Sequence, residues 1–366
     1  MNKKLLRYII GGIVLGLLTV LLAATVAMRV NTTPKTDTAA AEATPPASTP
    51  RPTPTPTPKA EKYTISFAGD CTLASSQYNN DFEIKMKGDY SYPFKNVVKY
   101  FEDDDLTVAN LECSFSDKKL TSDGTFYFVA PSDYANILVD GKIDFVTTAN
   151  NHRHDFAETG IADTEKALDA VSIAHAGENE TYIYDMNGIK VGFYCLFNGL
   201  VPTTSLVTKG IESLKVQGAE YIICALHWGI EGSYKVTDNQ KTVAHAAIDA
   251  GANVVYGSHP HVLQTIEEYD GGVILYSMGN FSFGGNTAPR DRDTAIVQVT
   301  VEKQADGSLK TDGYEIIPCC LSSTPSVNDY CPKPYEKDSE EYKRTMSKLD
   351  GTWTGKDLSV DYSAYH

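Results

Sequence analysis

The sequence YTISFAGDCTL, residues 63–73, begins with an apolar run at residues 63–68 that is followed by Gly69 and the single carboxylate of Asp70. A short run rich in β-branched and aromatic residues that stops at glycine is typical of a buried strand followed by a turn. Similar apolar runs follow at residues 106–109, 143–148, 221–226 and 253–256. We therefore expect five buried strands of this kind.

Segments with helical periodicity lie between these strands, at residues 94–101, 132–139, 158–170 and 238–250. The resulting β-α-β order favours parallel pairing of the strands. Antiparallel pieces are also expected, because turn sequences join residues 181–186 to 189–197 and residues 262–269 to 273–276, and residues 294–301 add another strand. The sequence therefore predicts a mixed α/β fold with more than one sheet.

Polar side chains of metal-ligand type follow the predicted strands. They are Asp70, Glu112, Asn150, Asn151, His152, His227, His259 and His261. Taken singly, each is more often a turn or structural residue. Their occurrence at the ends of five predicted strands favours one shared site. The carboxyl ends of strands in open α/β folds meet at a crevice where ligands bind. Carboxylate, amide and imidazole groups without a thiolate suit a divalent ion such as Zn, Mn or Fe.

The N-terminal region predicts an exported, membrane-anchored protein. Residues 1–7 contain three cations, and the uncharged residues 8–28 would span about 31 Å as a helix, enough to cross a bilayer. The excess of cations before this segment places residues 1–7 in the cytoplasm and the remainder outside the cell membrane. The alternative is a cleaved signal peptide, since Thr25, Val26 and Ala27 resemble a cleavage site.

Residues 29–60 contain eight prolines among Thr, Ala and Ser, and they predict a semi-rigid Pro/Thr-rich linker. Residues 61–320 are long enough for one large domain, and residues 321–366 form a C-terminal extension. The chain carries a formal charge of −15 although four of its cations belong to the anchor region. Such an acidic domain repels nucleic acid, so we expect no nucleic-acid partner.

The seven cysteines contain no CxxC pair, so they predict neither a zinc ribbon nor a dense disulfide framework. Cys71 and Cys113 directly follow Asp70 and Glu112, and strand alternation would place both thiols close together behind the polar site. A disulfide there is one interpretation; two unconnected buried thiols is the interpretation we favour.

Six segments together resemble the bacterial poly-γ-glutamate capsule-synthesis proteins of the CapA type, which are distantly similar to calcineurin-like metallophosphoesterases. In chain order they are FAGDCTL, VANLECSFSD, FVTTANNHRHDF, HWGIE, GSHPHVLQ and LYSMGNFSF. The resemblance covers about residues 63–301. It implies a metallophosphoesterase-like α/β/β/α sandwich of two mixed sheets.

The resemblance also implies a role for each polar residue. The implied metal ligands are Asp70, Glu112, Asn151, His227, His259 and His261. His152 matches the histidine that assists the leaving group in the phosphoesterases, which makes it the candidate catalytic residue. Thr72 stands where those enzymes carry a further histidine, so one metal position would have only Asp70, Glu112 and His261.

Asn150, Glu231, Asn280 and Arg290 are expected to bind substrate. Each has a plainer interpretation. Glu231 is equally a surface carboxylate or a further ligand, Gly279 and Asn280 form a common turn pair, and loop arginines such as Arg290 and Arg292 are usually just solvated.

Two functions remain open at this point. One is a metal-dependent hydrolase-like domain at the cell surface that acts on an anionic envelope polymer such as poly-γ-glutamate. In it, a divalent metal ion would lower the pKa of a water and His152 would protonate the leaving group. The other is a non-catalytic component of polymer assembly or export that keeps the same fold. A plain wall-binding module would explain the linker but not the clustered ligands.

Overall fold

The computed structural model describes residues 60–358 except residues 120 and 123. The predicted span at residues 8–28, and all but the last residue of the predicted linker, lie outside this part of the chain. Among the residues that are described, no helix is both long and apolar enough to cross a bilayer.

The first sheet contains the predicted strand that begins at Tyr63. Its strands are β1 (Lys62–Thr72), β2 (Leu106–Leu111), β5 (Phe145–Thr147), β6 (Ala174–Ala176), β13 (Asn280–Phe283), β14 (Asp293–Lys303), β15 (Leu309–Cys320) and β16 (Lys333–Pro334). Their order is β16-β15-β14-β1-β2-β5-β6, with β13 paired to the far end of β1. β1, β2, β5 and β6 are parallel, whereas β14, β15 and β16 continue the sheet antiparallel.

The second sheet has the order β11-β12-β10-β9-β8-β7. Its strands are β7 (Glu180–Met186), β8 (Ile189–Leu196), β9 (Tyr221–His227), β10 (Val254–Ser258), β11 (Ile266–Tyr269) and β12 (Gly272–Leu275). The four central strands are parallel, and the edge strands β7 and β11 are each joined to a neighbour as an antiparallel hairpin. A separate short pair consists of β3 (Ser114–Phe115) and β4 (Val129–Ala130).

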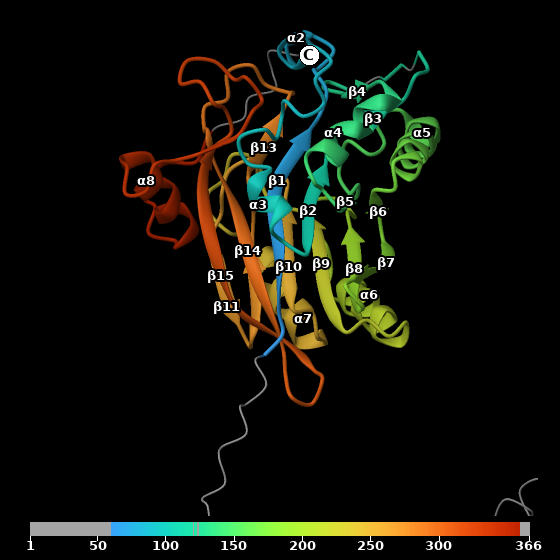
Figure 1. Ribbon diagram of the computed structural model, residues 1–366, viewed down its shortest axis with the longest axis vertical. Coiled ribbons are helices and arrows are strands. Elements are labelled where there is room, and N and C mark those ends of the chain that lie inside the picture. Colours follow the sequence, from blue (N-terminus) through green and yellow to red (C-terminus); the bar gives the residue numbers. More distant parts are fainter. Residues whose placement is uncertain (1–59, 120, 123, 359–366) are drawn as a thin grey trace, which may run out of the picture. The chain divides into compact units, whose positions relative to one another are not determined.

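Helices cover the outer face of each sheet (Figure 1). On the first sheet they are α3 (Lys99–Glu102), the 3-10 helix η1 (Ser132–Tyr134), α4 (Ala135–Asp140) and α5 (Ala157–Ala170), whereas α2 (Asp81–Met86) lies beyond the end of β1. On the second they are α6 (Thr204–Val216) and α7 (Asp238–Ala250), and α8 (Glu340–Leu349) lies against β14 and β15.

Three apolar clusters define the layers. The central cluster joins the two sheets, and in it the rings of Phe145 and Phe193 stack with their centroids 3.6 Å apart. A second cluster lies between the first sheet and its helices, and a third lies between the second sheet and α6 and α7. The chain therefore folds as helices, sheet, sheet, helices, and burial of apolar surface on both faces of each sheet is its main stabilising term.

The predicted mixed α/β fold with more than one sheet is confirmed. All five predicted strands are present as β1, β2, β5, β9 and β10, and the predicted helices at residues 158–170 and 238–250 are α5 and α7. The helix predicted at residues 94–101 is wrong over most of its length, because these residues form turns with bonds such as Val97 N to Phe94 O at 2.8 Å. Only α3 is helical there.

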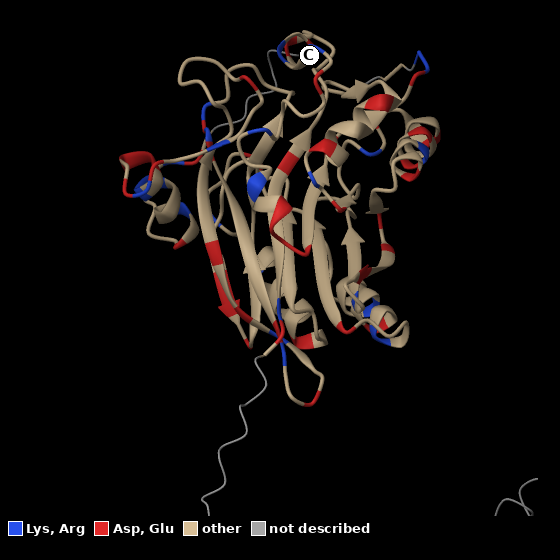
Figure 2. Cartoon of the chain, viewed as in Figure 1, with Lys and Arg blue, Asp and Glu red and all other residues tan. Residues whose placement is uncertain are grey.

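A buried ion-pair network fastens α8 to the start of β14. Lys348 is 4 % exposed, and its Nζ lies 2.8 Å from Asp291 Oδ1 and 2.7 Å from Asp293 Oδ2. Arg344 donates two hydrogen bonds to Asp293, at 2.8 and 2.7 Å. Burial alone would raise the pKa of Asp293, but Arg344 and Lys348 outweigh it and leave that pKa below its usual value. Figure 2 shows the mixed charges along α8.

The Asp293→Ala variant should lose about 3 kcal/mol of unfolding free energy, because Lys348 and Arg344 would lose their shared partner inside the protein. Urea denaturation measures this loss. The control Lys343→Ala removes an exposed ion pair with Glu340 on the same helix and should cost less than about 0.5 kcal/mol. Equal losses in the two variants would contradict the assigned role of the network.

Candidate metal centre

The carboxyl ends of strands from both sheets meet at one place. Asp70 lies near the end of β1 and Glu112 directly follows β2. From the other sheet, His227 is the last residue of β9 and His259 directly follows β10. Both sheets therefore contribute polar side chains to a single site, as the sequence predicted for strand ends.

Asp70, Glu112 and His261 form one group of candidate ligands. One ligand atom from each lies within 4.8 Å of the other two. His261 Nδ1 is 3.2 Å from Asp70 Oδ2, and its Nε2 is 3.8 Å from Glu112 Oε1. Both carboxylates are fully buried.

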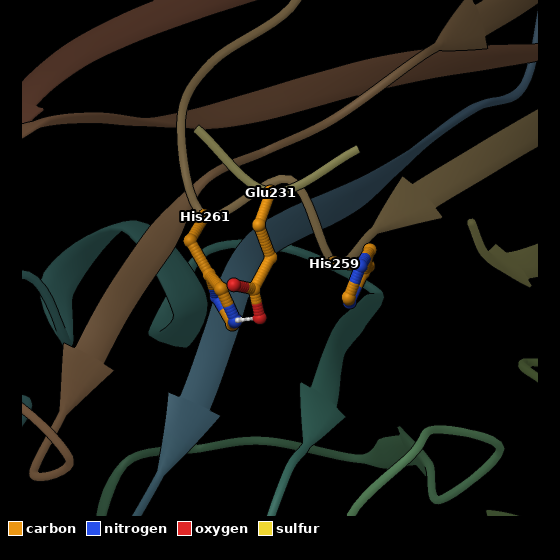
Figure 3. Close-up of side chains that lie close together, drawn as sticks. All are labelled: Glu231, His259 and His261. Carbon is orange, nitrogen blue, oxygen red and sulfur yellow. Dashed lines mark ion pairs between the residues drawn. The ribbon is translucent and has the colours of Figure 1, made fainter. Parts of the chain in front are cut away.

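A second group shares His261 with the first. It joins Glu231, His259 and His261, again with ligand atoms within 4.8 Å of one another. Figure 3 shows the Glu231 carboxylate beside the His261 ring, with His259 facing them from the end of β10. Glu231, left open by the sequence as a ligand or a surface carboxylate, therefore lies within the cluster.

His227 and Asn151 complete the cluster on the side of the second sheet. His227 Nε2 is 2.7 Å from Asn151 Oδ1 and 3.8 Å from Glu112 Oε1. The His227 and His259 rings are 4.8 Å apart at their centroids. Glu112 Oε1 thus lies at the same distance, 3.8 Å, from Nε2 of His227 and from Nε2 of His261.

The loop that carries the two paired histidines is strained. His259 has φ 98° and His261 has φ 57°, on either side of Pro260. A residue other than glycine held at positive φ costs about 1–3 kcal/mol, and such residues gather at functional sites. The observed strain is what aims both imidazoles into the cluster.

Two glycines let the strands approach closely enough for this arrangement. A Cβ on Gly69 would lie 2.1 Å from Gly279 O, and Asp70 N donates to that same oxygen at 2.8 Å. A Cβ on Gly257 would lie 2.1 Å from Tyr276 O. Both sites therefore exclude side chains, because the backbone of a neighbouring segment occupies the space.

The electrostatics of the cluster separate its histidines. Burial lowers the pKa of His227 well below its usual value, and burial together with His261 lowers the pKa of His259 to about 3. Burial acts in the same direction on His261, but Glu112 and Asp70 outweigh it and raise the pKa of His261 to about 10. Burial also raises the pKa of Glu112 well above its usual value.

The donor set fits a divalent cation. Asp70 Oδ2, Glu112 Oε1 and both ring nitrogens of His259 are buried and have no hydrogen-bond partner among the described residues. Leaving such groups unpaired inside a protein is costly. A cation here would pair with the two carboxylate oxygens and with one of the His259 nitrogens, and mixed N/O donors suit Zn, Mn or Fe.

Three supporting residues were not found from the sequence. Asn110 Nδ2 donates to Asp70 Oδ1 at 2.9 Å and to Glu112 Oε2 at 3.3 Å. Ser258 Oγ lies 2.9 Å from His227 Nδ1, which orients that ring as outer partners orient metal-ligating histidines. Asp155 lies 3.0 Å from His152 Nδ1.

The residues predicted to bind substrate divide into two kinds. Asn280, Glu231 and Arg290 line a hollow of about 500 Å³ that also contains His152 and His261. Asn150 does not line it: its amide donates to Asn110 Oδ1 at 3.0 Å and to Leu111 O at 2.8 Å. Its place is therefore a supporting one behind the cluster, because its amide hydrogens are already used.

Arg292 and the cysteines have structural places. Arg292 donates to the backbone oxygens of Pro325 and Val327, both at 2.5 Å. Cys71 and Cys113 are buried free thiols in one apolar cluster, in keeping with the favoured interpretation, and the other described cysteines are free as well.

The C-terminal tail supports the loop that carries Glu231. Leu358 N donates to Gly232 O at 2.8 Å, and the Asp357 carboxylate accepts from Ser233 Oγ at 3.1 Å and from Tyr234 N at 3.0 Å. Residues distant in sequence are thereby tied to the rim of the hollow.

The His259→Ala variant should bind metal at least about tenfold more weakly than the unaltered protein, because a buried candidate ligand that has no other hydrogen-bond partner among the described residues is removed. His152→Ala is the control, since the His152 ring is engaged by Asp155 and lies in neither ligand group. Metal analysis after equilibrium dialysis measures both. Equal loss in the two variants would contradict the assignment.

Metal binding should release about one proton per ion near neutral pH, because His261 with its raised pKa carries a proton that a cation must displace. Lower proton concentration favours that displacement, so affinity should rise with pH between about 7 and 9. Calorimetry in buffers of different ionisation enthalpy counts the protons. A pH-independent affinity over this range would argue against a protonated His261.

The chain is similar to bacterial proteins of capsule synthesis. The model of the family described as "Bacterial capsule synthesis protein PGA_cap" matches residues 64–285. The chain is 26% identical over 339 residues to the "Capsule biosynthesis protein CapA" of Bacillus anthracis, covering 84% of this chain and 79% of that protein. It is 28% identical over 280 residues to the "PGA biosynthesis protein CapA" of Bacillus subtilis (strain 168), covering 70% of each.

Solved structures are similar only at a distance. The Haemophilus influenzae NAD nucleotidase has a TM-score of 0.39 at 14% identity, with 83% of this chain and 64% of that one covered. The purple acid phosphatase of yellow lupin seeds has a TM-score of 0.37 at 12% identity, with 82% and 58% covered. This chain therefore spans less than two thirds of either structure.

The family match covers more than half of the chain and all of the predicted metal ligands, and the protein belongs to the family of bacterial capsule synthesis proteins.

Proposed function

We propose that this protein is a metal-dependent hydrolase of capsule synthesis, with a fold of the metallophosphoesterase type, that acts on an anionic envelope polymer of the poly-γ-glutamate kind. The observation that carries the proposal is the set of buried, unpartnered oxygen and nitrogen donors around Glu112 Oε1. The names of the two Bacillus relatives suggest the polymer, since one is a capsule biosynthesis protein and the other a PGA biosynthesis protein.

The cluster offers two neighbouring cation positions that share Glu112. Asp70, Glu112 and His261 would hold one of them. Glu112, Asn151, His227 and His259 would hold the other, with Glu231 beside it. A bound divalent ion would polarise the scissile carbonyl or phosphoryl oxygen and lower the pKa of a water.

His152 is positioned to serve as the general acid. A carboxylate only accepts hydrogen bonds, so Asp155 holds one proton of His152 on Nδ1. To act as the general acid, His152 would be an imidazolium whose second proton, on Nε2, faces the substrate. The ring also packs edge-on against Phe128, with centroids 4.7 Å apart. These contacts hold the imidazole on the wall of the hollow, where it would protonate the departing group.

The charge balance of the chain supports a role for cations. With 47 Asp and Glu against 32 Lys and Arg, the protein repels a polyanion in bulk. Cations at the cluster, together with the exposed Arg290 on the wall of the hollow, would supply local attraction.

The direction of β1 separates the candidate metal centre from the point where the chain enters the domain. β1 begins at Lys62 and reaches Asp70 eight residues later, so the chain enters the domain about 26 Å from the cluster, at the opposite end of the sheet (Figure 1). With the predicted anchor at residues 8–28 in the cell membrane, the domain would lie outside the cell with the centre far from its point of attachment.

Thr72 favours one alternative. It stands where phosphoesterases carry a histidine, and its buried Oγ1 has no hydrogen-bond partner among the described residues. The position held by Asp70, Glu112 and His261 therefore has one imidazole fewer. A non-catalytic component of polymer assembly or export, with a single tightly bound ion, is the function that this difference supports.

The test is a hydrolysis assay of the full-length protein loaded with Mn, Zn or Fe, with γ-linked glutamate polymer and a phosphodiester as substrates. His152→Ala should lower kcat by about 10²–10⁴ and leave metal content unchanged, because it removes the acid and no ligand. His259→Ala should lose both activity and metal. A metal-loaded protein that cleaves neither substrate would leave the non-catalytic function.

A further inference from the structure

A second hollow, of about 730 Å³, lies between the tail that follows α8 and the β11–β12 hairpin. Its volume lies in the range of roughly 300–1,000 Å³ that is usual for ligand sites. Tyr234, Tyr276 and Trp353 are part of its wall, and none of the candidate metal ligands is. It adjoins the hollow of the metal centre, because Tyr234 on its wall donates to Asp291 on the wall of the other, at 2.9 Å.

Three lysines on this wall have no ion-pair partner among the described residues. Lys235, Lys241 and Lys356 are exposed, and none of them forms an ion pair with a residue that the structure describes. In a chain with a net charge of −15, three unpaired lysines at one hollow are a local reversal of sign.

The two carboxylates on the same wall are held by other donors and form no ion pair with these three lysines. Hydrogen bonds from neutral donors do not remove their charge, so they offset the lysines only in part. Glu267 accepts from Tyr276 Oη at 2.7 Å and lies 3.0 Å from His245 Nε2. Asp357 is held by Ser233 and the backbone of Tyr234, as described above. The hollow therefore presents cations and aromatic rings to a ligand.

We propose that this lysine-lined hollow binds a carboxylate-bearing stretch of the polymer and holds it beside the metal centre, an inference that rests on the polymer named in the proposed function. Lysine ammonium groups attract carboxylates. The aromatic rings offer apolar surface to the methylene groups of the polymer that lie between its carboxylates. Tyr234 of one wall contacts Asp291 of the other, so a polymer chain that occupied both hollows would pass over this contact. Simultaneous contact raises the effective concentration of polymer at the metal centre.

Trp353 provides a direct probe of the hollow. The chain has two tryptophans, and the other, Trp228, is fully buried and donates to Tyr276 O at 2.9 Å. Trp353 is fixed by its backbone bond to Ser347 O at 2.8 Å, and its ring lies 6.0 Å from that of Tyr234. A ligand in the hollow should therefore change tryptophan emission mainly through Trp353.

The experiment titrates the full-length protein with a short γ-linked glutamate oligomer in the presence of EDTA, which keeps the metal centre empty. Emission should change on binding in the unaltered protein, and Trp353→Phe should abolish that change while calorimetry still detects binding. A triple change of Lys235→Gln, Lys241→Gln and Lys356→Gln should raise Kd at least about tenfold.

The matched control carries the same loss of three charges on exposed lysines of α2, α5 and α6. It is Lys85→Gln, Lys166→Gln and Lys209→Gln, and it should change Kd by less than about twofold. Equal weakening by the two triple changes would overturn the site in favour of general charge attraction. Tighter binding of polyphosphate than of the glutamate oligomer would overturn the carboxylate ligand.

The result of this titration can be distinguished from the result of the hydrolysis assay. Binding in EDTA by a protein that cleaves no substrate would support this site and remove the enzymatic role. Cleavage by a protein that binds no oligomer in EDTA would leave the metal centre as the place of polymer contact and overturn the second site.

Discussion

The burial of the Glu112 carboxylate is the constraint on which the site depends. An isolated carboxylate inside a protein is strongly unfavourable unless charges and hydrogen bonds compensate it. Here Asn110 donates to one of its oxygens, and the other faces His227 and His261 without a hydrogen-bond partner among the described residues. The strained loop of His259 and His261 and the glycine contacts at Gly69 all serve to bring compensating groups to this oxygen.

This constraint also explains why two sheets are needed. A single parallel sheet places ligands along one edge, and its strands lie about 4.8 Å apart, so distant strands cannot address a common point. Stacking two sheets brings β10 against β1, and the Tyr256 hydroxyl of β10 donates to Ala68 O of β1 at 2.7 Å. Donors from the ends of both sheets then surround one small volume.

Much of the arrangement followed from local sequence signals, because the buried strands are apolar on both faces and their ends are marked by glycine and polar residues. The supporting residues could not be predicted from local sequence signals. Asn110 lies inside β2 and looks like an interruption of an apolar run, and its role appears only when β1 lies beside it. Ser258 and Asp155 are likewise defined by partners from elsewhere in the fold.

The missed elements have a similar cause. α6 contains Gly210, which weakens the local helical signal, yet a Cβ there would lie 2.4 Å from the Tyr194 ring, so glycine is required by packing. Along most of β15, exposed and half-buried residues alternate, and the strand contains Gly313 and Pro318. Local propensity assigns these two residue types to loops. The segment from residue 321 to 366 was predicted only as an extension, whereas α8 within it is tied to β14 through Lys348.

The distribution of charge connects the two hollows to one physical problem. An acidic protein that handles a polyanion must create attraction locally while it keeps repulsion elsewhere, since repulsion limits unspecific binding. At the candidate metal centre the buried carboxylates would recruit cations, and these carboxylates also raise the pKa of His261 to about 10. At the second hollow Lys235, Lys241 and Lys356 would supply the attraction, because they outnumber the two carboxylates on the same wall and form no ion pair with a described residue. Attraction at two adjoining places, within an otherwise repulsive surface, would direct a flexible polymer to the reactive groups without trapping it along the rest of the domain.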